Sequence, residues 1–362
     1  IFAAVFSQDL TMLHRMTYLG GSKKDSLGAM VLDQNNRVYL VGTTASSNFP
    51  VTPNAYSTDF FDAQINVSDM FVACLNDKVD QLVSSTYLGS DKEDKAFAMD
   101  INALGQLFIA GMSAGKMPEV GPQWQTYTTG LVFAKMDADL ENLLATNSIG
   151  EFGESRPTDI VVDSTGHLYA TGYTRDAQFP VSPGAFSQNL TGKNDAFVLR
   201  VEKDLSQVLA GTYIGGFEDD YAYTLMVDTL QNVYLAGETR SSNFPVTVNA
   251  EDHTFTNELP LRSDAFICMM DSLLRTMKNS SFFGGSGNQA IFEIARDSLF
   301  NIVFAGYTGS GHIPTFCYSY DDIYNGFEDA FIGMYSEKLV QLEHTTFLGG
   351  SLNDRALCVE IG

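Results

Sequence analysis

Short apolar segments recur along the 362-residue chain and are separated by turn-forming residues. In the first complete repeat they cover residues 29–32, 38–42, 71–75 and 82–88. The first two segments of each repeat are nearly continuous apolar runs, which predicts strands buried on both faces. The fourth segment alternates more and should lie towards the outside. No segment has a 3.6-residue apolar period long enough for a major helix, so the pattern predicts four-stranded antiparallel units.

Three sequence phrases repeat in one phase. The first is Thr-Tyr-Leu-Gly-Gly, and its aromatic column reads Tyr18, Tyr87, Ser148, Tyr213, Phe282 and Phe347, at steps of 69, 61, 65, 69 and 65 residues. The second phrase ends on Gly42, Gly111, Gly172, Gly237 and Gly306. The third column reads Phe2, Phe71, Val132, Phe197, Phe266 and Phe331. Because the three columns keep the same series of steps, the chain is built from a repeat of about 65 residues.

Sheets that are apolar on both faces need a neighbour on each side, which a β-propeller provides. Residues 2–6 match a third strand and residues 356–360 match a first strand. We therefore predict an all-β fold over 1–362: a single β-propeller domain with five complete blades and a sixth blade shared by the two termini. The sixth blade lacks its second strand, and a seventh blade stays open if sequence is missing. The chain begins in a strand without an initiator Met, so we expect a processed piece of a longer chain.

Two columns of acidic residues accompany the strands. The first column lies in the hairpin turns between the first and second strands. It indicates tight two-residue turns, together with turn residues that tolerate positive φ, such as Asn36, Gly105 and Gly166. A second column follows strand four, where the carboxylates either form a Ca²⁺ ring or accept hydrogen bonds from backbone amides of the adjoining turn. We favour the amide interpretation because no compact Asp-x-Asp-x-Asp-Gly loop occurs. The two columns are Asp33, Asp163, Asp228 and Asp297, and Asp25, Asp94, Asp220 and Asp354 with Ser155 and Gln289 in the other units.

Charge and composition exclude several classes of function. The 44 acidic residues outweigh 21 Lys and Arg, giving a net charge of −23, so binding to nucleic acid or anionic lipid is not expected. No apolar run approaches the roughly 18 residues that a membrane-spanning helix needs, and no signal peptide opens the chain. The four cysteines share no metal-ligand spacing, and we interpret them as small buried side chains.

Catalysis finds little support in the sequence. The five histidines occupy unrelated positions in their repeats, and no nucleophile motif accompanies them. The glycines of residues 284–287 lack the Gly-Lys-Ser/Thr ending of a phosphate-binding loop. A pair of axial carboxylates able to hydrolyse glycosides stays an alternative. We expect no catalytic residue and no cofactor.

Long connections between the second and third strands are the best candidates for function, because loops of this length are uncommon unless they are functional. They span about residues 44–68, 113–129, 174–194, 239–263 and 308–328, and they should form one elaborated rim. A recurring Phe-Pro pair is interpreted as an anchor between blades. The variable aromatic residues either cover their own blade or contact a partner. These candidate contact residues are Phe60, Phe61, Trp124, Tyr127, His253, Phe255, Tyr318, Tyr320 and Tyr324.

Several phrases together resemble the bacterial repeat called SBBP. They include Asp195-Ala196-Phe197-Val198, Ser85-Thr86-Tyr87-Leu88-Gly89, the segment from Val162 to Thr174, and Ser47-Asn48-Phe49-Pro50-Val51. The resemblance covers nearly the whole chain and implies a propeller. It also implies a secreted or cell-surface bacterial protein, of the kind that many Bacteroidetes export by a type IX system. The repeat carries no catalytic residues of its own.

The sequence therefore predicts a non-enzymatic extracellular scaffold or adhesion module that presents its long loops to a protein partner. Two alternatives stay open: a carbohydrate-active enzyme with an axial carboxylate pair, and a lectin-like propeller that binds a surface glycan. No contact with nucleic acid and no direct membrane insertion are expected.

Overall fold

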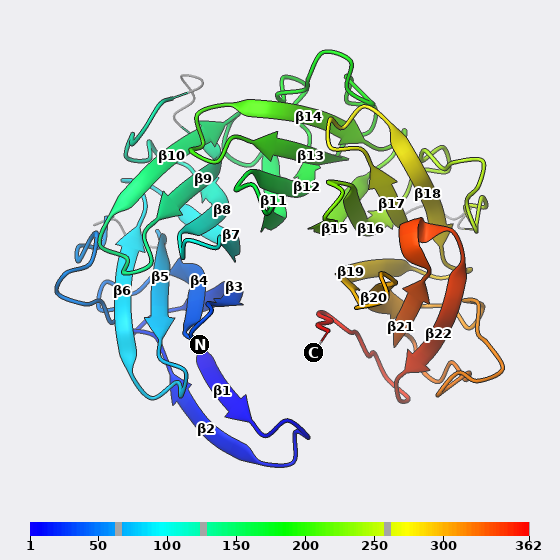
Figure 1. Ribbon diagram of the computed structural model, residues 1–362, viewed down its shortest axis with the longest axis horizontal. Coiled ribbons are helices and arrows are strands. Elements are labelled where there is room, and N and C mark those ends of the chain that lie inside the picture. Colours follow the sequence, from blue (N-terminus) through cyan, green and yellow to red (C-terminus); the bar gives the residue numbers. More distant parts are fainter. Residues whose placement is uncertain (62–66, 124–128, 257–261, 362) are drawn as a thin grey trace. The chain divides into compact units, whose positions relative to one another are not determined.

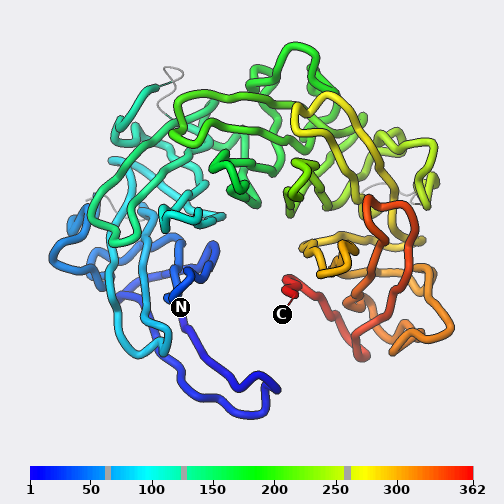
Figure 2. The backbone as a smooth tube through the Cα atoms, viewed as in Figure 1, coloured from blue at the N-terminus to red at the C-terminus, as the bar shows by residue number. Residues whose placement is uncertain are grey.

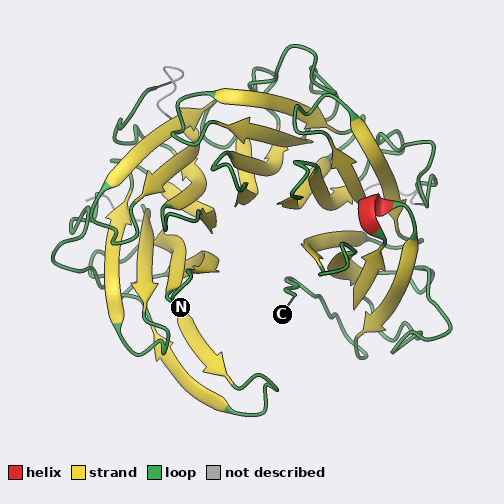
Figure 3. Ribbon diagram, viewed as in Figure 1, coloured by secondary structure: helices red, strands yellow, loops and turns green. Residues whose placement is uncertain are grey.

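The computed structural model describes residues 1–61, 67–123, 129–256 and 262–361, and it divides into two compact units. The first unit comprises Ile1–Tyr169 and Arg200–Leu209, and the second comprises Ala170–Leu199 and Ala210–Gly362. Strands dominate both units, and a single short 3₁₀ turn, Glu337–Leu339, is the one helical element of the described residues (Figure 3).

The strands form one two-stranded and five four-stranded sheets, in which sequence neighbours pair (Figure 1). The two-stranded sheet contains β1 (Phe2–Phe6) and β2 (Leu13–Tyr18). The next sheet contains β3 (Asp25–Leu32), β4 (Val38–Thr44), β5 (Asp69–Leu75) and β6 (Leu82–Leu88). It is followed by β7 (Asp94–Ile101), β8 (Leu107–Ser113), β9 (Gly130–Met136) and β10 (Leu143–Ile149). The fourth contains β11 (Ser155–Val162), β12 (Leu168–Thr174), β13 (Asp195–Val201) and β14 (Val208–Ile214). The fifth contains β15 (Asp220–Val227), β16 (Val233–Thr239), β17 (Asp264–Met270) and β18 (Met277–Phe283). The last contains β19 (Gln289–Arg296), β20 (Ile302–Thr308), β21 (Asp329–Tyr335) and β22 (Leu342–Leu348).

The turns between first and second strands have the predicted positive φ, but they contain three residues rather than the predicted two, because Asp33 pairs with Arg37 across residues 34–36. Asn36, Gly105 and Gly166 have φ values of 58°, 74° and 89°. Positive φ at these positions gives a tight turn the twist that an antiparallel strand pair requires. The described pairings of first with second strands also share a bulge near their start, between Leu27 and Ala29 in β3 and between Ala222 and Thr224 in β15. The predicted all-β fold of four-stranded antiparallel propeller sheets is therefore confirmed.

Within each unit, neighbouring sheets share a hydrophobic core. In the first unit, Tyr39 and Val72 belong to the same buried cluster as Ile109 and Val132 of the following sheet. In the second unit, Ile267 packs in one cluster with Phe331. The second strands, such as β4, are thus buried on both faces, as their continuous apolar sequences predict. The same prediction is wrong for the first strands, because each lies at the edge of its sheet and keeps partly exposed residues, most of all β3.

The prediction of a first strand at residues 356–360 is wrong, because this segment forms no strand in the described chain. In complete sheets such as β3-β4-β5-β6, the first strand pairs only with the second. In the described chain no second strand pairs with residues 356–360, and the Ala356 N–H donates instead to the Gly306 carbonyl at 3.2 Å. The N-terminal sheet has two strands where a three-stranded blade was expected. Closure of the ring by the chain ends remains a prediction.

Strand four is more buried than predicted, because a long connection lies along its outer edge. In the first unit, the Thr52 N–H donates to the Ser85 carbonyl and the Tyr87 N–H donates to the Ser57 carbonyl. The second unit repeats the pattern, since the Thr247 N–H donates to the Ser280 carbonyl. The last five residues of β6 are consequently buried. The connections therefore cover exposed strand edges as well as bordering the sheets (Figure 2).

The cysteine prediction holds for two of four residues. Cys74 and Cys268 are buried, whereas Cys317 and Cys358 are exposed, and none of the four forms a disulfide bond. Cys317 lies in a long connection that the sequence pattern could not orient. In the part of the chain that the structure describes, no helix is long and apolar enough to cross a membrane.

Candidate functional site

The phenylalanines of the Phe-Pro pairs anchor the long connections on their own sheets, and the predicted packing between blades is seen for Phe49, which shares a core cluster with Ala3 of the N-terminal sheet. Phe49, Phe179 and Phe244 are each buried against the phenylalanine of the third-strand column. Their ring centroids lie 4.5 Å from Phe71, 4.6 Å from Phe197 and 4.4 Å from Phe266, respectively. Ring contacts at this spacing add stabilisation to the burial itself. Each connection therefore begins from a fixed point.

The carboxylates that follow strand four accept backbone hydrogen bonds, which confirms the amide interpretation. Asp94 Oδ2 accepts from the Ser90 N–H at 2.6 Å, and Asp220 Oδ2 accepts from the Gly216 N–H at 2.7 Å. Asp25 and Asp354 make the same bond to Gly21 and Gly350, both at 2.8 Å. Burial raises the pKa of Asp94 to about 6 and that of Asp220 to about 7.

The hairpin-turn aspartates use the same chemistry in a different place. Asp228 Oδ1 accepts from the N–H groups of Leu230 and Asn232, both at 2.8 Å. Asp33, Asp163 and Asp297 make the equivalent pair of bonds in their own turns. Both acidic columns therefore stabilise turns, and no group of three or more potential metal ligands occurs within the described ranges.

Four of the predicted contact residues lie against their own sheets. Phe60 and Phe61 are half-buried beside the core of the first four-stranded sheet, with the Phe60 ring 5.6 Å from Tyr87. Phe255 lies 5.8 Å from Phe282, and Tyr324 lies 6.1 Å from Phe347. For these four, the interpretation as cover for the blade describes their position. Trp124 and Tyr127 fall outside the described residues.

The other three predicted residues are exposed: His253, Tyr318 and Tyr320. The two tyrosines belong to the tyrosine loop, residues 309–328, which joins β20 to β21. Tyr318 is 94% exposed and Tyr320 is 87% exposed. The same loop also exposes Ile323 and Phe327, which the sequence analysis did not select. The tyrosine loop therefore presents four large apolar side chains to solvent.

Hydrogen bonds hold the tyrosine loop against the edge strand β22. The Ser319 hydroxyl donates to the Thr345 carbonyl at 2.6 Å, and the Asp321 N–H donates to Thr346 Oγ1 at 2.8 Å. Nearer β21, the Asn325 N–H donates to Asp329 Oδ2 at 2.8 Å. The exposed side chains therefore project from a backbone that is fixed at several points.

A second group of side chains gathers at the base of the long connections in the second unit, and sequence reasoning missed it. The group, named here the Arg–Tyr cluster, comes from the starts of β15 and β19, the ends of β16 and β20, and the segments beside β21 and after β22. It consists of Tyr221, Tyr223, Glu238, Arg240, Phe292, Tyr307, Glu328 and Arg355. The one signal in the sequence was Glu238, because the corresponding positions of the other second strands hold no carboxylate.

Glu238 is the buried carboxyl group of the Arg–Tyr cluster. Its Oε2 accepts from the Ser263 hydroxyl at 3.4 Å, and its Oε1 lies 3.9 Å from Arg240 Nη2. Burial raises the pKa of Glu238, while Arg240 and a hydrogen bond from Tyr223 act in the opposite direction. A buried carboxyl group with charged partners is a common feature of functional sites.

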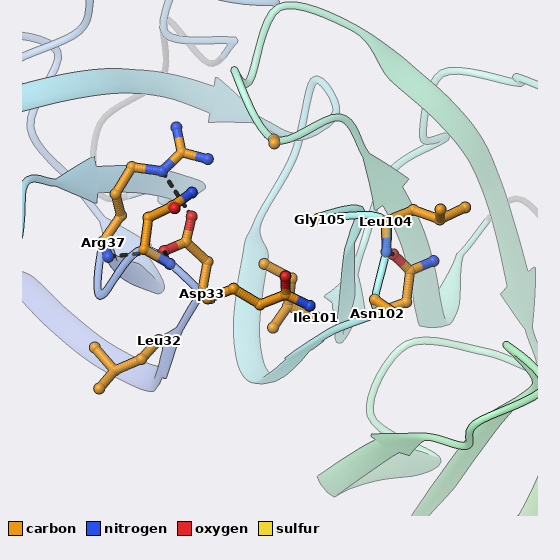
Figure 4. A pocket seen from close by; sticks show the side chains of 11 residues that line it. Leu32, Asp33, Arg37, Ile101, Asn102, Leu104 and Gly105 are labelled. Carbon is orange, nitrogen blue, oxygen red and sulfur yellow. Dashed lines mark hydrogen bonds and ion pairs between the residues drawn. The ribbon is translucent and has the colours of Figure 1, made fainter.

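A shallow hollow lies at the opposite end of the sheets in the first unit, between the β3–β4 and β7–β8 turns (Figure 4). Its volume is about 330 Å³, and Leu32, Asp33, Arg37 and Leu104 contribute to its lining. Arg37 Nε donates to Asp33 Oδ2 at 2.7 Å, so both charged groups are already paired. The hollow therefore results from adjacent turns, and its polar groups serve the turns themselves.

A comparison with known families identifies one repeat directly. The family described as "SBBP: Beta-propeller repeat" matches residues 211–245, which run from β14 through β15 and β16 to Pro245. Residues 211–245 are an SBBP repeat. The matched segment contains Tyr213 of the first recurring phrase, Gly237 of the second, and Phe244 of an anchor pair. The resemblance predicted from those phrases is therefore confirmed.

Solved structures similar to this chain have low sequence identity. A protein of unknown function from Dyadobacter fermentans is 10% identical, with a TM-score of 0.46, covering 92% of this chain and 86% of that one. An ulvan lyase of polysaccharide lyase family PL25 is 7% identical, with a TM-score of 0.45, and the match covers 88% of this chain and 69% of the lyase. A gluconolactonase from Xanthomonas campestris is 12% identical, with a TM-score of 0.36, covering 93% and 90%. No curated protein matches the chain. At these identities and TM-scores, the likenesses say nothing about what this chain binds or catalyses.

Proposed function

We propose that this SBBP-repeat protein is a non-enzymatic interaction module that acts outside the cell and binds a protein partner through its long connections. The tyrosine loop is the principal contact surface. The extracellular setting rests on the resemblance to secreted SBBP proteins, and the role as scaffold or adhesion module follows from a repeat that varies its loops around fixed strands.

The observation that carries the proposal is the exposure of four large apolar side chains on one anchored loop. Tyr318 and Tyr320 lie next to Ile323 and Phe327 in sequence, and all four are exposed. Tyrosine offers a large contact area with few rotatable bonds, so it loses little conformational entropy on binding. Because the loop backbone is already bonded to β22, binding needs little further ordering of the loop.

The experiment first isolates partners from the envelope and culture fluid of the source organism, using the purified chain as bait. Each candidate is then produced separately and titrated by calorimetry against the chain and a Tyr318→Ala/Tyr320→Ala variant. We expect the double substitution to weaken binding at least about 30-fold, since an interface hot spot contributes about 2 kcal/mol or more.

A matched control replaces two exposed apolar residues on other loops of the second unit, Phe217→Ala/Val248→Ala. The control variant should bind with the affinity of the unchanged chain. The proposal is wrong if no candidate binds the purified chain, or if the two variants reduce affinity equally.

A further inference from the structure

The repeat provides an internal comparison that separates what a blade requires from what the Arg–Tyr cluster adds. The penultimate position of the second strand holds a carboxylate only in β16, where Glu238 is buried. Removing a carboxyl group from water is costly, and four other blades fold without one at this position. The corresponding residues are Thr43, Met112, Tyr173 and Tyr307. Glu238 is therefore not required by the fold.

Arg240 presents hydrogen-bond donors that the described protein leaves unused. A guanidinium group has five N–H donors. Its nearest carboxylate oxygens lie 3.6 Å away on Asp219 and 3.9 Å away on Glu238, which is beyond hydrogen-bond distance. Within the described ranges, no side-chain hydrogen bond satisfies Arg240, and its Nε atom is buried without an acceptor. The side chain is 31% exposed, so its other donors are accessible to a ligand.

Arg355, which follows β22, is held in a fixed orientation by Glu328. Its Nε donates to Glu328 Oε2 at 2.7 Å and its Nη2 donates to Glu328 Oε1 at 2.9 Å. The guanidinium carbon lies 4.1 Å from the centroid of the Tyr307 ring. The positive charges of Arg240 and Arg355 both act on Glu238. The Arg355 side chain is 45% exposed, so this fork also faces solvent.

The aromatic members of the cluster form a rigid base. The Phe292 ring stacks on Tyr307 at 5.6 Å and approaches Tyr223 at 5.3 Å. Tyr221 lies beneath the Arg240 guanidinium, with 5.8 Å between the guanidinium carbon and the ring centroid. Tyr221 and Tyr223 are half-buried, so part of each ring is accessible beside the charged groups. The side chains are therefore held in place before any ligand arrives.

The charges of the cluster indicate the class of ligand. Two guanidinium groups face the carboxylates of Asp219, Glu238 and Glu328, so no excess positive charge remains to hold a phosphate or sulfate group. The groups that reach solvent beside the aromatic surface include donors on both arginines and carboxylate acceptors, of which Glu238 keeps 11% of its side chain exposed. A sugar ring matches this combination, because its hydroxyl groups donate and accept while its C–H faces are apolar.

We propose that Tyr221, Tyr223, Glu238, Arg240 and Arg355 form a binding site for a neutral saccharide. Ligand hydroxyl groups accept hydrogen bonds from Arg240 and Arg355 and donate to Glu238, and the sugar ring lies against the tyrosines. This site is separate from the tyrosine loop, so a saccharide and a protein partner would bind through different groups.

The test uses the whole chain and calorimetric titration with neutral hexasaccharides of glucose, mannose and xylose, with oligogalacturonate and heparin hexasaccharides as the acidic arm. At least one neutral hexasaccharide should bind saturably. Glu238→Gln and Arg240→Gln should each weaken that binding about tenfold or more, the usual loss for hydrogen bonds to charged groups. The matched control is Lys95→Gln, at the position of β7 that corresponds to Arg355, and it should leave the affinity unchanged.

Three results would overturn the proposal: no binding of any neutral hexasaccharide, binding of the acidic ones alone, or equal affinity in the cluster variants and the unchanged chain. If Glu238→Gln does not fold, Arg355→Gln on the half-exposed side chain gives the same test. The Tyr318→Ala/Tyr320→Ala variant should keep its saccharide affinity, which distinguishes failure of this site from failure of the tyrosine loop.

Discussion

Replacing Asp220 by Asn should make the chain relatively more stable as pH rises. Asp220 is fully buried, and its Oδ2 accepts hydrogen bonds from the Gly216 N–H and from the Ser241 hydroxyl at 2.8 Å. The Thr239 hydroxyl donates to its Oδ1. The same column holds Gln289 at the start of β19, so a neutral amide is compatible with this position.

The magnitude follows from the pKa of Asp220, which burial raises from 3.8 to about 7. Because the folded-state pKa exceeds the unfolded-state value, the folded chain binds the additional proton between these two values. Stability from this group is complete below about pH 4 and is lost as pH rises through 7. Integrating the linkage between pH 5 and pH 8 gives a loss of about 2 to 3 kcal/mol. Asp220→Asn removes this loss.

The assay is urea unfolding of the unchanged chain and of Asp220→Asn, measured by circular dichroism at several pH values from 5 to 8. At pH 5 the variant should be less stable by about 1 kcal/mol because one hydrogen bond is altered. By pH 8 the difference should have moved in favour of the variant by about 2 to 3 kcal/mol.

Asp94→Asn gives an internal scale for this prediction. The pKa of Asp94 is raised by burial to about 6, so its pH-dependent gain over the same range should be smaller, about 1 to 2 kcal/mol. A constant difference between variant and unchanged chain at every pH would refute the reasoning, since it would mean that Asp220 is ionised in the folded state throughout.

The remaining predictions concern packing and exposure. Tyr87→Ala should cost about 3 to 5 kcal/mol in urea unfolding, whereas Tyr18→Ala in the same repeat column should cost less than about 0.5 kcal/mol, because Tyr87 is 1% exposed and Tyr18 is 79% exposed; equal costs would contradict the open N-terminal sheet. Phe244→Ala should destabilise the chain by about 3 kcal/mol or more and speed proteolysis of the loop that it anchors, which limited digestion with mass spectrometry measures; unchanged cleavage would contradict the anchor. A thiol reagent at pH 8 should modify two cysteines in the folded chain and all four after unfolding. The reason is that burial raises the pKa of Cys74 to about 11 and also raises the pKa of Cys268. Four rapid reactions in the folded chain would contradict the burial assignments. The thiols expected to react first are Cys317 and Cys358.

The fold was predictable because each blade repeats the same local solution. Strand predictions at 38–42 and 71–75 fall within β4 and β5, and the turn residue Asn36 has the positive φ expected. The Phe49 anchor also follows from the repeat, since its partner Phe71 belongs to a recurring column. Periodic apolar positions encode these features because the same contact recurs in every unit.

The Arg–Tyr cluster was not predictable in this way. Arg240 and Arg355 are far apart in sequence, and only the packing of neighbouring sheets brings their charges to Glu238. The tyrosine loop poses a related problem, because Tyr320 points to solvent while Tyr324 covers Phe347. That difference depends on hydrogen bonds between the loop and β22, which composition does not encode.

The most direct test of the proposed function is photo-cross-linking from one defined position at a time, compared between the two ends of the last sheet. A photoreactive amino acid is placed at Tyr318 in the tyrosine loop and, in a matched chain, at Val340 in the turn between β21 and β22. Both positions are exposed, and they lie at opposite ends of the sheet. With a partner validated by titration, the account predicts a cross-link from position 318 and none from position 340. Cross-linking from position 340 alone would contradict it.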